Sequence, residues 1–256
     1  MTKPEQIPQI SHLLDAIRTR CGPHLIGVYL HGSLAMGCFQ PARSDIDALV
    51  ITDAVLTLAT KRHLIEDILL ISKSPHPIEI SFVSQAQLHP WRYPCPYDLH
   101  FSEDHRERLT ADLANDMWRK WNDNEFTDPD LAVHVAVTRA RGICLDGPPA
   151  TDILPDVPAA DYLSALRFDL VDYEHLCATN PVYCILNCCR VLAYQRVGAI
   201  LSKAEGGAYG LEHLPARYHA IITTALTVYQ GEIDDHSLDI RSCQEFLAYT
   251  SAELSL

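Results

Sequence analysis

Three carboxylate residues in the first third of the chain stand where they could hold a metal ion. Asp45 and Asp47 lie either side of Ile46 at the start of an apolar stretch, and Glu79 lies in the next such stretch, residues 78–83. Side chains alternate between the faces of a strand, so Asp45 and Asp47 project from the same side. If the two stretches are neighbouring strands, the three carboxylates converge and repel one another unless a cation is bound.

Magnesium is the cation that such a group suits best. Mg²⁺ binds through one or two carboxylates together with substrate phosphates. Two ions about 3.5–4 Å apart stabilise the attacking and leaving oxygens at phosphorus. Gly32 and Ser33 follow a predicted strand, where a glycine and the backbone N–H groups of a helix start admit a phosphate. Each piece alone is common in solvated strands and turns, but their order and spacing favour phosphoryl or nucleotidyl transfer.

Hydrophobic periodicity predicts the elements that position these residues. Strands are expected at residues 24–31, 44–52 and 78–83, and a short one within 142–149. Proline and aromatic residues predict irregular structure at 89–103. Helical spacing of apolar residues is found at 7–17, 55–71, 106–113, 131–140, 163–176, 182–197, 213–228 and 242–254. We therefore predict an α/β domain at residues 1–150 and an all-helical domain at 151–256, with the proline-rich segment 151–158 at the boundary.

Composition limits the classes of protein to which the chain can belong. It has 256 residues, 48% of them hydrophobic, and 33 acidic against 20 basic residues give a net charge of −13. That balance disfavours a nucleic-acid partner, because such proteins carry Lys/Arg patches. The first residues lack the basic start and apolar core of a signal peptide, and no apolar run reaches about 18 residues, so we expect neither a secretion signal nor a membrane span. We expect a cytoplasmic protein without a membrane partner, and a monomer. Its acidity is explained either by ordinary solubility or by attraction of a cationic substrate, and composition leaves both open.

Cysteine and histidine usage points to neither disulfides nor a zinc motif. The nine cysteines include no CxxC pair, and an odd number in a chain without a secretion signal argues against a disulfide framework. Cys184 and Cys188 are expected to be small buried residues of a helix. The thirteen histidines contain no HExxH pattern, and most of them are expected to be surface or ordinary packing residues.

The motifs resemble a known family. GSLAMG followed by SDID is similar to the signature of the polymerase-β-type nucleotidyltransferase superfamily. More narrowly, HGSLAMGCFQPARSDIDALVIT, IEISF, PWRYP with DLHFSE, and NPVYCILNCCRVLAY resemble the aminoglycoside adenylyltransferases that act on spectinomycin and streptomycin. The resemblance runs from about residue 25 to residue 230. It implies an α/β (α+β) nucleotidyltransferase domain with a small mixed sheet, followed by an all-α helical-bundle domain.

The resemblance also implies a mechanism. Asp45, Asp47 and Glu79 would hold magnesium, with two ions expected, and Glu79 would be the general base that takes a proton from the drug hydroxyl. The hydroxyl would attack the α-phosphorus of ATP, so that AMP is transferred and pyrophosphate leaves. The residues implied in nucleotide binding are Gly32, Ser33, Ser44, Arg190, Lys203 and Tyr229. Possible drug contacts in the helical domain are Asp169, Asp172 and Tyr173.

The chain departs from the family pattern at positions linked to drug handling. Relatives that accept both drugs carry a tryptophan where this chain has Asp104, and aspartates where it has Leu176 and Asn180. These departures favour spectinomycin, adenylylated at its 9-hydroxyl with resistance as the result, over streptomycin. Two alternatives stay open on sequence alone: a nucleotidyltransferase that modifies a protein or RNA partner, and a non-catalytic nucleotide-binding regulator.

Overall fold

The chain divides into two compact units, Met1–Val157 and Pro158–Leu256. The computed structural model describes residues 4–168, 170, 173–232 and 238–254. The predicted boundary lay at residues 150/151. The observed division falls inside the proline-rich boundary segment 151–158, because Ile153, Leu154 and Val157 pack into an apolar cluster of the first unit. Within the described ranges, no helix combines the length and apolar character that crossing a membrane requires.

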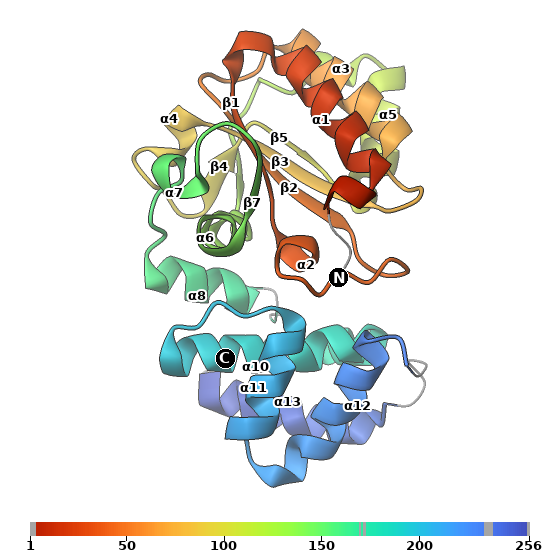
Figure 1. Cartoon of the computed structure of the whole chain (residues 1–256), viewed down its shortest axis with the longest axis vertical. Coiled ribbons are helices and arrows are strands. Elements are labelled where there is room, and N and C mark those ends of the chain that lie inside the picture. Colours follow the sequence, from red (N-terminus) through yellow and green to blue (C-terminus); the bar gives the residue numbers. More distant parts are fainter. Residues whose placement is uncertain (1–3, 169, 171–172, 233–237, 255–256) are drawn as a thin grey trace. The chain divides into compact units, whose positions relative to one another are not determined.

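The first unit is built around a mixed sheet with the strand order β5-β3-β2-β1-β7 (Figure 1). Its strands are β1 (Leu25–Leu30), β2 (Ile46–Thr52), β3 (Ile78–Ser84), β5 (Leu99–Phe101) and β7 (Ile143–Asp146). A second, two-stranded sheet pairs β4 (Cys95–Tyr97) with β6 (Phe126–Asp128). The small mixed sheet predicted for this domain is therefore confirmed.

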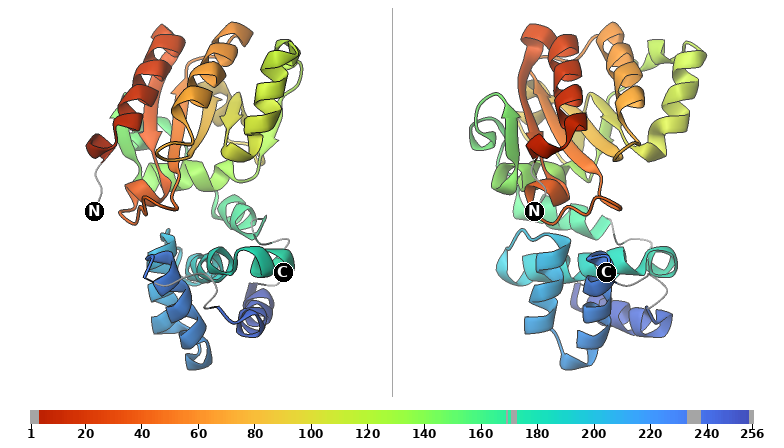
Figure 2. Two further views of the ribbon diagram at one scale, coloured as in Figure 1. Left: turned by 90° about the vertical axis from the view of Figure 1, so that its right-hand side faces the viewer. Right: turned by 45° about the vertical axis from the view of Figure 1, so that its right-hand side comes forward.

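Helices cover the sheet of the first unit on both faces, as the views in Figures 1 and 2 show. The α-helices are α1 (Pro8–Cys21), α2 (Gly32–Ala35), α3 (Leu58–Ile71), α4 (Gln85–Leu88), α5 (Arg106–Ala114), α6 (Leu131–Arg141) and α7 (Ala150–Ile153). Short 3₁₀ helices are η1 (Pro4–Gln6), η2 (Gly22–His24), η3 (Glu103–His105) and η4 (Met117–Lys120). Apolar residues of α1, α3 and α5 form one buried cluster with the sheet, and residues of α6 and α7 contribute to another.

Strand alternation divides the side chains of β2 and β3 between these two layers. Ile46, Ala48 and Val50 lie in the cluster beneath α1, α3 and α5, as their positions in the sequence predict. Leu49 and Val83 lie in the opposite cluster. The strands that carry the predicted site are thus anchored by apolar residues on both faces, and the polar residues at their ends are held by that packing.

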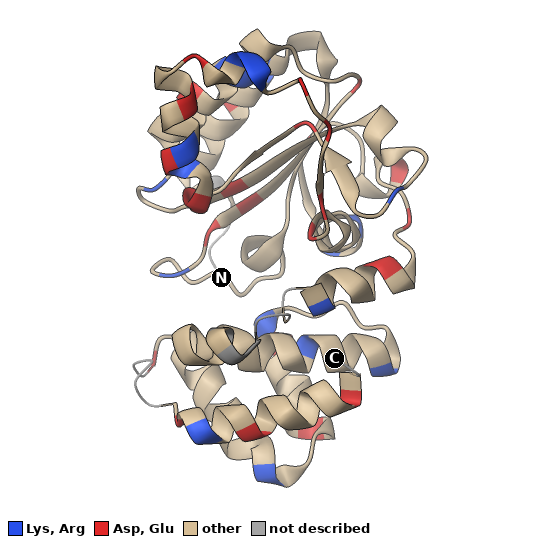
Figure 3. Cartoon of the chain, turned by 180° about the vertical axis from the view of Figure 1, so that it is seen from behind, with Lys and Arg blue, Asp and Glu red and all other residues tan. Residues whose placement is uncertain are grey.

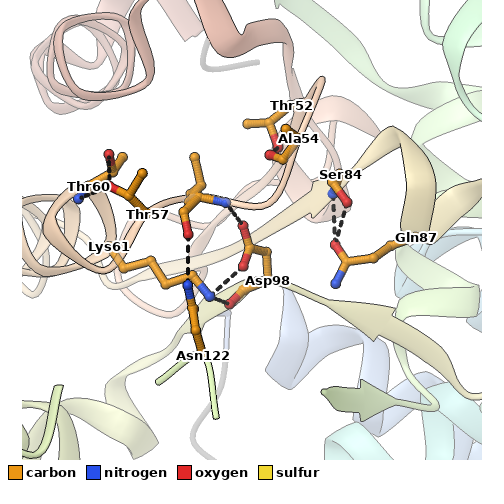
Figure 4. Close-up of polar contacts among 10 residues, drawn as sticks. Thr52, Ala54, Thr57, Thr60, Lys61, Ser84, Gln87, Asp98 and Asn122 are labelled. Atoms are coloured by element: carbon orange, nitrogen blue, oxygen red, sulfur yellow. Dashed lines mark hydrogen bonds and ion pairs between the residues drawn. The ribbon is translucent and has the colours of Figure 1, made fainter. Parts of the chain in front are cut away.

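A buried ion pair ties α3 to the segment between β4 and β5. Lys61 of α3 pairs with Asp98, and the two side chains are 3% and 1% exposed. Lys61 Nζ also donates to the Asp98 carbonyl oxygen at 2.8 Å, and the Asp98 carboxylate accepts from the backbone N–H of Leu56 (Figure 4). Asn122 Nδ2 donates to the Leu56 carbonyl at 3.1 Å. These hydrogen bonds satisfy charges that would be costly to bury alone.

The second unit is helical. Its α-helices are α8 (Ala159–Phe168), α9 (Tyr173–Thr179), α10 (Pro181–Val197), α11 (Lys203–His213), α12 (His219–Tyr229) and α13 (Ile240–Leu254), with the 3₁₀ helix η5 (Ala216–Tyr218). Helix α10 is its centre and packs against α9, α11, α12 and α13. Asn180 caps α10 by accepting from Tyr183 N, Pro181 occupies its first turn, and Gly198 ends it at φ 67°. Cys184 and Cys188 are buried in α10, as expected.

The structure differs from the predicted elements in three places. The predicted helix 163–176 is two helices, α8 and α9. The segment 89–103, predicted irregular, contains β4 and β5. Helix α11 was largely missed because glycines lower helix propensity. Three glycines nevertheless lie in α11, where a Cβ would collide with residues of α10 and α12; they are Gly206, Gly207 and Gly210.

Candidate active site

Asp47 and Glu79 lie side by side at the start of two parallel strands. They are register partners in the β2–β3 ladder, next to the partners Ile46 and Ile78. Asp45 directly precedes β2, and its charge acts on Glu79. Figure 3 shows these acidic segments of β2 and β3 next to each other. The structure therefore brings together the three carboxylates that the sequence places in one patch.

The turn after β1 brings the backbone up to Asp47. Gly32 opens α2 with φ +58°, a conformation that favours glycine, and a Cβ at this position would overlap the Asp47 carboxylate. His31 N donates to the Asp47 carbonyl oxygen at 3.0 Å, which fixes the turn against β2. The Ser33 hydroxyl is buried and, among the described residues, has no hydrogen-bond partner. The Ser44 hydroxyl already has a nearby hydrogen-bond partner, since it accepts from Gln40 N at 3.0 Å.

We expect Gly32→Ala to disrupt the site. The left-handed backbone costs about 1–3 kcal/mol for a residue other than glycine, and the new methyl group would also displace the Asp47 carboxylate. Gly22→Ala is the matched control, because Gly22 has φ +54° and open space around its Cβ position. The thermal unfolding temperature should fall in both variants, whereas the rate of nucleotide transfer should fall strongly only in Gly32→Ala. Equal activity in the two variants would contradict this role of Gly32.

The Glu79 carboxylate lies in an environment that makes it more basic. Burial is the largest cause and raises the pKa of Glu79, and the negative charges of Asp130 and Asp45 raise it further. The positive charge of His134 acts in the opposite direction and lowers it. A carboxylate with a raised pKa is a better proton acceptor, so the surroundings of Glu79 suit a general base.

Asp130 and His134 are site residues that the sequence reasoning missed. Asp130 precedes α6 and His134 lies one turn later, so both face the same side of the helix. His134 Nε2 is 3.1 Å from Asp130 Oδ2 and 3.9 Å from Glu79 Oε1. The signal was present as an Asp and a His four residues apart at the start of an apolar helix. His134 is therefore an exception to the expectation that most of the histidines are surface or ordinary packing residues.

The histidines of the site hold different charges. Burial disfavours a charged His134, but the carboxylates of Asp130, Glu79 and Asp47 outweigh it and raise the pKa of His134 to about 10. His31, whose ring centroid lies 4.6 Å from that of His134, is 3% exposed. Burial and the neighbouring His134 charge hold the pKa of His31 well below its usual range. The surroundings thus favour the charged form of His134 and the neutral form of His31.

The acidic surface continues past His134 onto β6. Asp128 Oδ1 accepts from Asp130 N at 2.9 Å, and burial raises the pKa of Asp128. The ring of Tyr97 stacks on that of Phe126, with centroids 5.9 Å apart. Carboxylates next to an aromatic stack are suited to a ligand that carries amino groups on a carbon skeleton.

The predicted nucleotide-binding residues of the second unit lie in two places. Arg190 of α10 donates from Nε to the Leu201 carbonyl at 2.9 Å and from Nη1 to Asn187 Oδ1 at 2.8 Å. Lys203 begins α11, two residues after Leu201, and its Nζ lies 4.4 Å from the centroid of the Tyr183 ring. The segment 201–203 therefore brings Arg190 and Lys203 into one region. Tyr229 ends α12 and is half-buried.

The predicted drug contacts of the helical unit lie mostly outside the part of the chain that the structure describes. Asp169 and Asp172 lie outside the described residues. Tyr173 begins α9, but its side chain is outside the described part of the chain. Their roles therefore stay predictions.

Comparison with known proteins agrees with this arrangement. Residues 10–108 match the family model described as nucleotidyltransferase domain, and residues 152–253 match that described as aminoglycoside adenylyltransferase, C-terminal domain. An aminoglycoside (3'') (9) adenylyltransferase of Escherichia coli is 30% identical, over 96% of this chain and 94% of the relative. The chain belongs to the aminoglycoside adenylyltransferase family. It is thus a nucleotidyltransferase, as its motifs predict.

Other members of the adenylyltransferase family are similar over most of their length. A spectinomycin 9-adenylyltransferase of Staphylococcus aureus is 28% identical, over 89% of this chain and 86% of the relative. The crystal structure of spectinomycin adenyltransferase AAD(9) from Enterococcus faecialis with ATP and spectinomycin has a TM-score of 0.81. It is 22% identical and covers 97% of this chain and 99% of that chain. This likeness confirms the predicted fold class.

The residues present fit magnesium and the phosphates of a nucleotide. The donor set formed by Asp45, Asp47 and Glu79 is all oxygen, which is the set that Mg²⁺ prefers. Gly32 leaves the backbone of the turn close to Asp47, and the buried Ser33 hydroxyl has no hydrogen-bond partner among the described residues. Both features lie where a phosphate chelated by a metal would need them.

Proposed function

We propose that the protein transfers AMP from ATP to a hydroxyl of spectinomycin, in a magnesium-dependent reaction that confers resistance to the antibiotic. The observation that carries the proposal is the parallel register of Asp47 and Glu79, which supports the pairing of a carboxylate suited to a metal ion with one whose pKa is raised. The membership of the chain in the aminoglycoside adenylyltransferase family supports the same reaction class.

Glu79 is the proposed general base. Its carboxylate accepts the proton of the acceptor hydroxyl as the oxygen attacks the α-phosphorus of ATP. The bond from the α-phosphorus to the bridging oxygen breaks, and pyrophosphate leaves. Magnesium at Asp45 and Asp47, with Glu79 alongside, supplies charge neutralisation at the phosphates when it is bound.

The remaining proposed nucleotide contacts come from both units. In the first unit, Gly32 and Ser33 offer a close backbone and a buried hydroxyl, and Ser44 lies one residue before Asp45. In the second unit, Arg190 offers a guanidinium fork and Lys203 a mobile point charge, both suited to phosphates. Tyr229 is assigned to the nucleotide on the family resemblance.

Two features support a cationic acceptor, and spectinomycin in particular. The carboxylates of Asp128 and Asp130 extend the acidic patch beyond Glu79, beside the aromatic stack of Tyr97 and Phe126. Spectinomycin carries amino groups that such carboxylates attract. Relatives that use both drugs carry a tryptophan where this chain has Asp104 and an aspartate where it has Asn180. The Asn180 side chain caps α10.

The test is pyrophosphate release by the purified protein with ATP and one acceptor at a time. We expect release with spectinomycin, much slower release with streptomycin, and none when EDTA removes the metal. Release with streptomycin but not with spectinomycin would contradict the substrate assignment. Undiminished release in EDTA would contradict the role of magnesium.

A further inference from the structure

A nitrogen ligand stands beside the carboxylates of the site. Glu79, Asp130 and His134 each offer one ligand atom, and all three atoms lie within 4.8 Å of one another. Among the described residues, no other group of three or more His, Cys, Asp and Glu side chains is arranged in this way. The proposed reaction uses Glu79, counts Asp130 only as part of the acidic patch that attracts the acceptor, and gives no role to His134.

The spacing of these atoms fits a small divalent ion. Ligand atoms about 2.0–2.2 Å from a tetrahedral metal lie about 3.4 Å apart. His134 Nε2 is 3.1 Å from Asp130 Oδ2 and 3.9 Å from Glu79 Oε1, so the two distances bracket that value. The His134 side chain is 11% exposed, whereas Asp130 and Glu79 are 31% and 29% exposed. The histidine is therefore fixed by burial, while the carboxylate side stays open to an entering ion and to water.

The chemistry of the donors separates this group from the magnesium carboxylates. Mg²⁺ takes oxygen ligands, whereas an imidazole nitrogen together with carboxylates suits Zn²⁺, Co²⁺ or Ni²⁺. The carboxylates around His134 also attract a divalent cation, since the attraction scales with charge. The imidazole binds such an ion through Nε2 in its neutral form.

We propose that Glu79, Asp130 and His134 bind Zn²⁺ or a similar borderline transition-metal ion, at a position that shares Glu79 with the magnesium carboxylates but not Asp45. An ion at this position coordinates the lone pair of Glu79 that would otherwise accept the acceptor proton. Zinc is thus an inhibitor of the transfer reaction. The inhibition rests on the proposed function, whereas the binding site itself does not.

The binding test uses the full-length, metal-free protein titrated with Co²⁺, a spectroscopic substitute for Zn²⁺, with excess Mg²⁺ present. The titration is run at about pH 8, where fewer protons compete with the metal ion for its ligands than at neutral pH. Competition with Zn²⁺ then gives the zinc affinity. We expect His134→Gln and Asp130→Asn each to weaken the zinc affinity by more than about 10-fold. Loss of a residue that only supports a metal ligand already costs about 10-fold, and these two residues are proposed ligands.

Two control variants and one spectral feature make the binding result specific. His12→Gln changes an exposed histidine of α1, and Glu107→Gln changes an exposed glutamate of α5, so both should keep the wild-type zinc affinity. Circular dichroism establishes that each variant is folded. The site is refuted if His134→Gln and Asp130→Asn bind zinc like the wild type, or if the wild type does not bind Co²⁺. An intense near-ultraviolet band of thiolate ligation would also refute it.

The inhibition is measured separately, by pyrophosphate release with and without Zn²⁺. We expect zinc to inhibit the wild type and to inhibit His134→Gln at more than about 10-fold higher concentration, following the loss of affinity. Full activity of the wild type with zinc bound would overturn the inhibitory role. Absence of transfer without any zinc would instead contradict the proposed function, so the two failures are distinguishable.

Discussion

Glu79→Gln is expected to lower the rate of adenylyl transfer by about 10²–10⁴-fold, the range typical for loss of a general base. The amide keeps the size of the side chain but cannot accept the proton of the attacking hydroxyl. Asp45 and Asp47 remain to hold magnesium, so ATP binding should stay close to that of the wild type. Single-turnover kinetics, with the ATP affinity measured separately, distinguish the two effects.

Glu107→Gln is the matched control for this variant, because Glu107 is an exposed residue of α5 and undergoes the same chemical change. It should retain full activity. A Glu79→Gln enzyme that transfers AMP at more than about a tenth of the wild-type rate would show that another group takes the proton, since general-base help is worth more than that. A parallel loss of ATP affinity and rate would instead assign Glu79 to nucleotide binding alone.

Lys61→Met is expected to reduce the free energy of unfolding by about 3–5 kcal/mol, because it leaves a buried charge without its partner. Lys61 and Asp98 are almost completely buried, and Asp98 also holds the backbone N–H of Leu56. The pair connects α3 to the start of β5, next to the strands that carry the active site. Chemical denaturation followed by circular dichroism measures the loss.

Arg62→Met provides the comparison from the adjacent position. Arg62 pairs with Glu66 one turn away, and its guanidinium lies 5.0 Å from the centroid of the Trp118 ring. Such contacts contribute about 0.3–0.5 and about 0.5–1 kcal/mol. Adding Asp98→Asn to Lys61→Met should recover part of the stability, because it removes the unpaired charge and keeps an acceptor for Leu56 N. Equal losses of unfolding free energy in Lys61→Met and Arg62→Met would show that the buried pair contributes no more to stability than the contacts of Arg62.

The sequence was informative where local patterns determine structure. Alternation along 44–52 and 78–83 assigned the apolar residues of β2 and β3 to their layers, and the structure confirms that assignment. The sequence predicts that Asp47 and Glu79 converge if the two strands are neighbours, and in the structure the strands are neighbours. Their exact register depends on the packing of α3 between them in the chain, which no local pattern specifies.

Contacts between distant segments could not be read in the same way. His134 lies 55 residues from Glu79 in the sequence, and only the packing of α6 against the sheet brings them together. The three glycines of α11 weaken the helical signal, although close packing on α10 and α12 is what requires them. The residues of the second unit were assigned by resemblance alone, since each has the character of an ordinary surface residue.

The most direct test of the central claim is mass spectrometry of spectinomycin after incubation with the protein, ATP and Mg²⁺. The proposed mechanism predicts that the drug gains an adenylyl group, with equimolar pyrophosphate, and that Glu79→Gln gives no such product. Spectinomycin recovered unmodified from wild-type protein that binds ATP tightly would contradict the assignment.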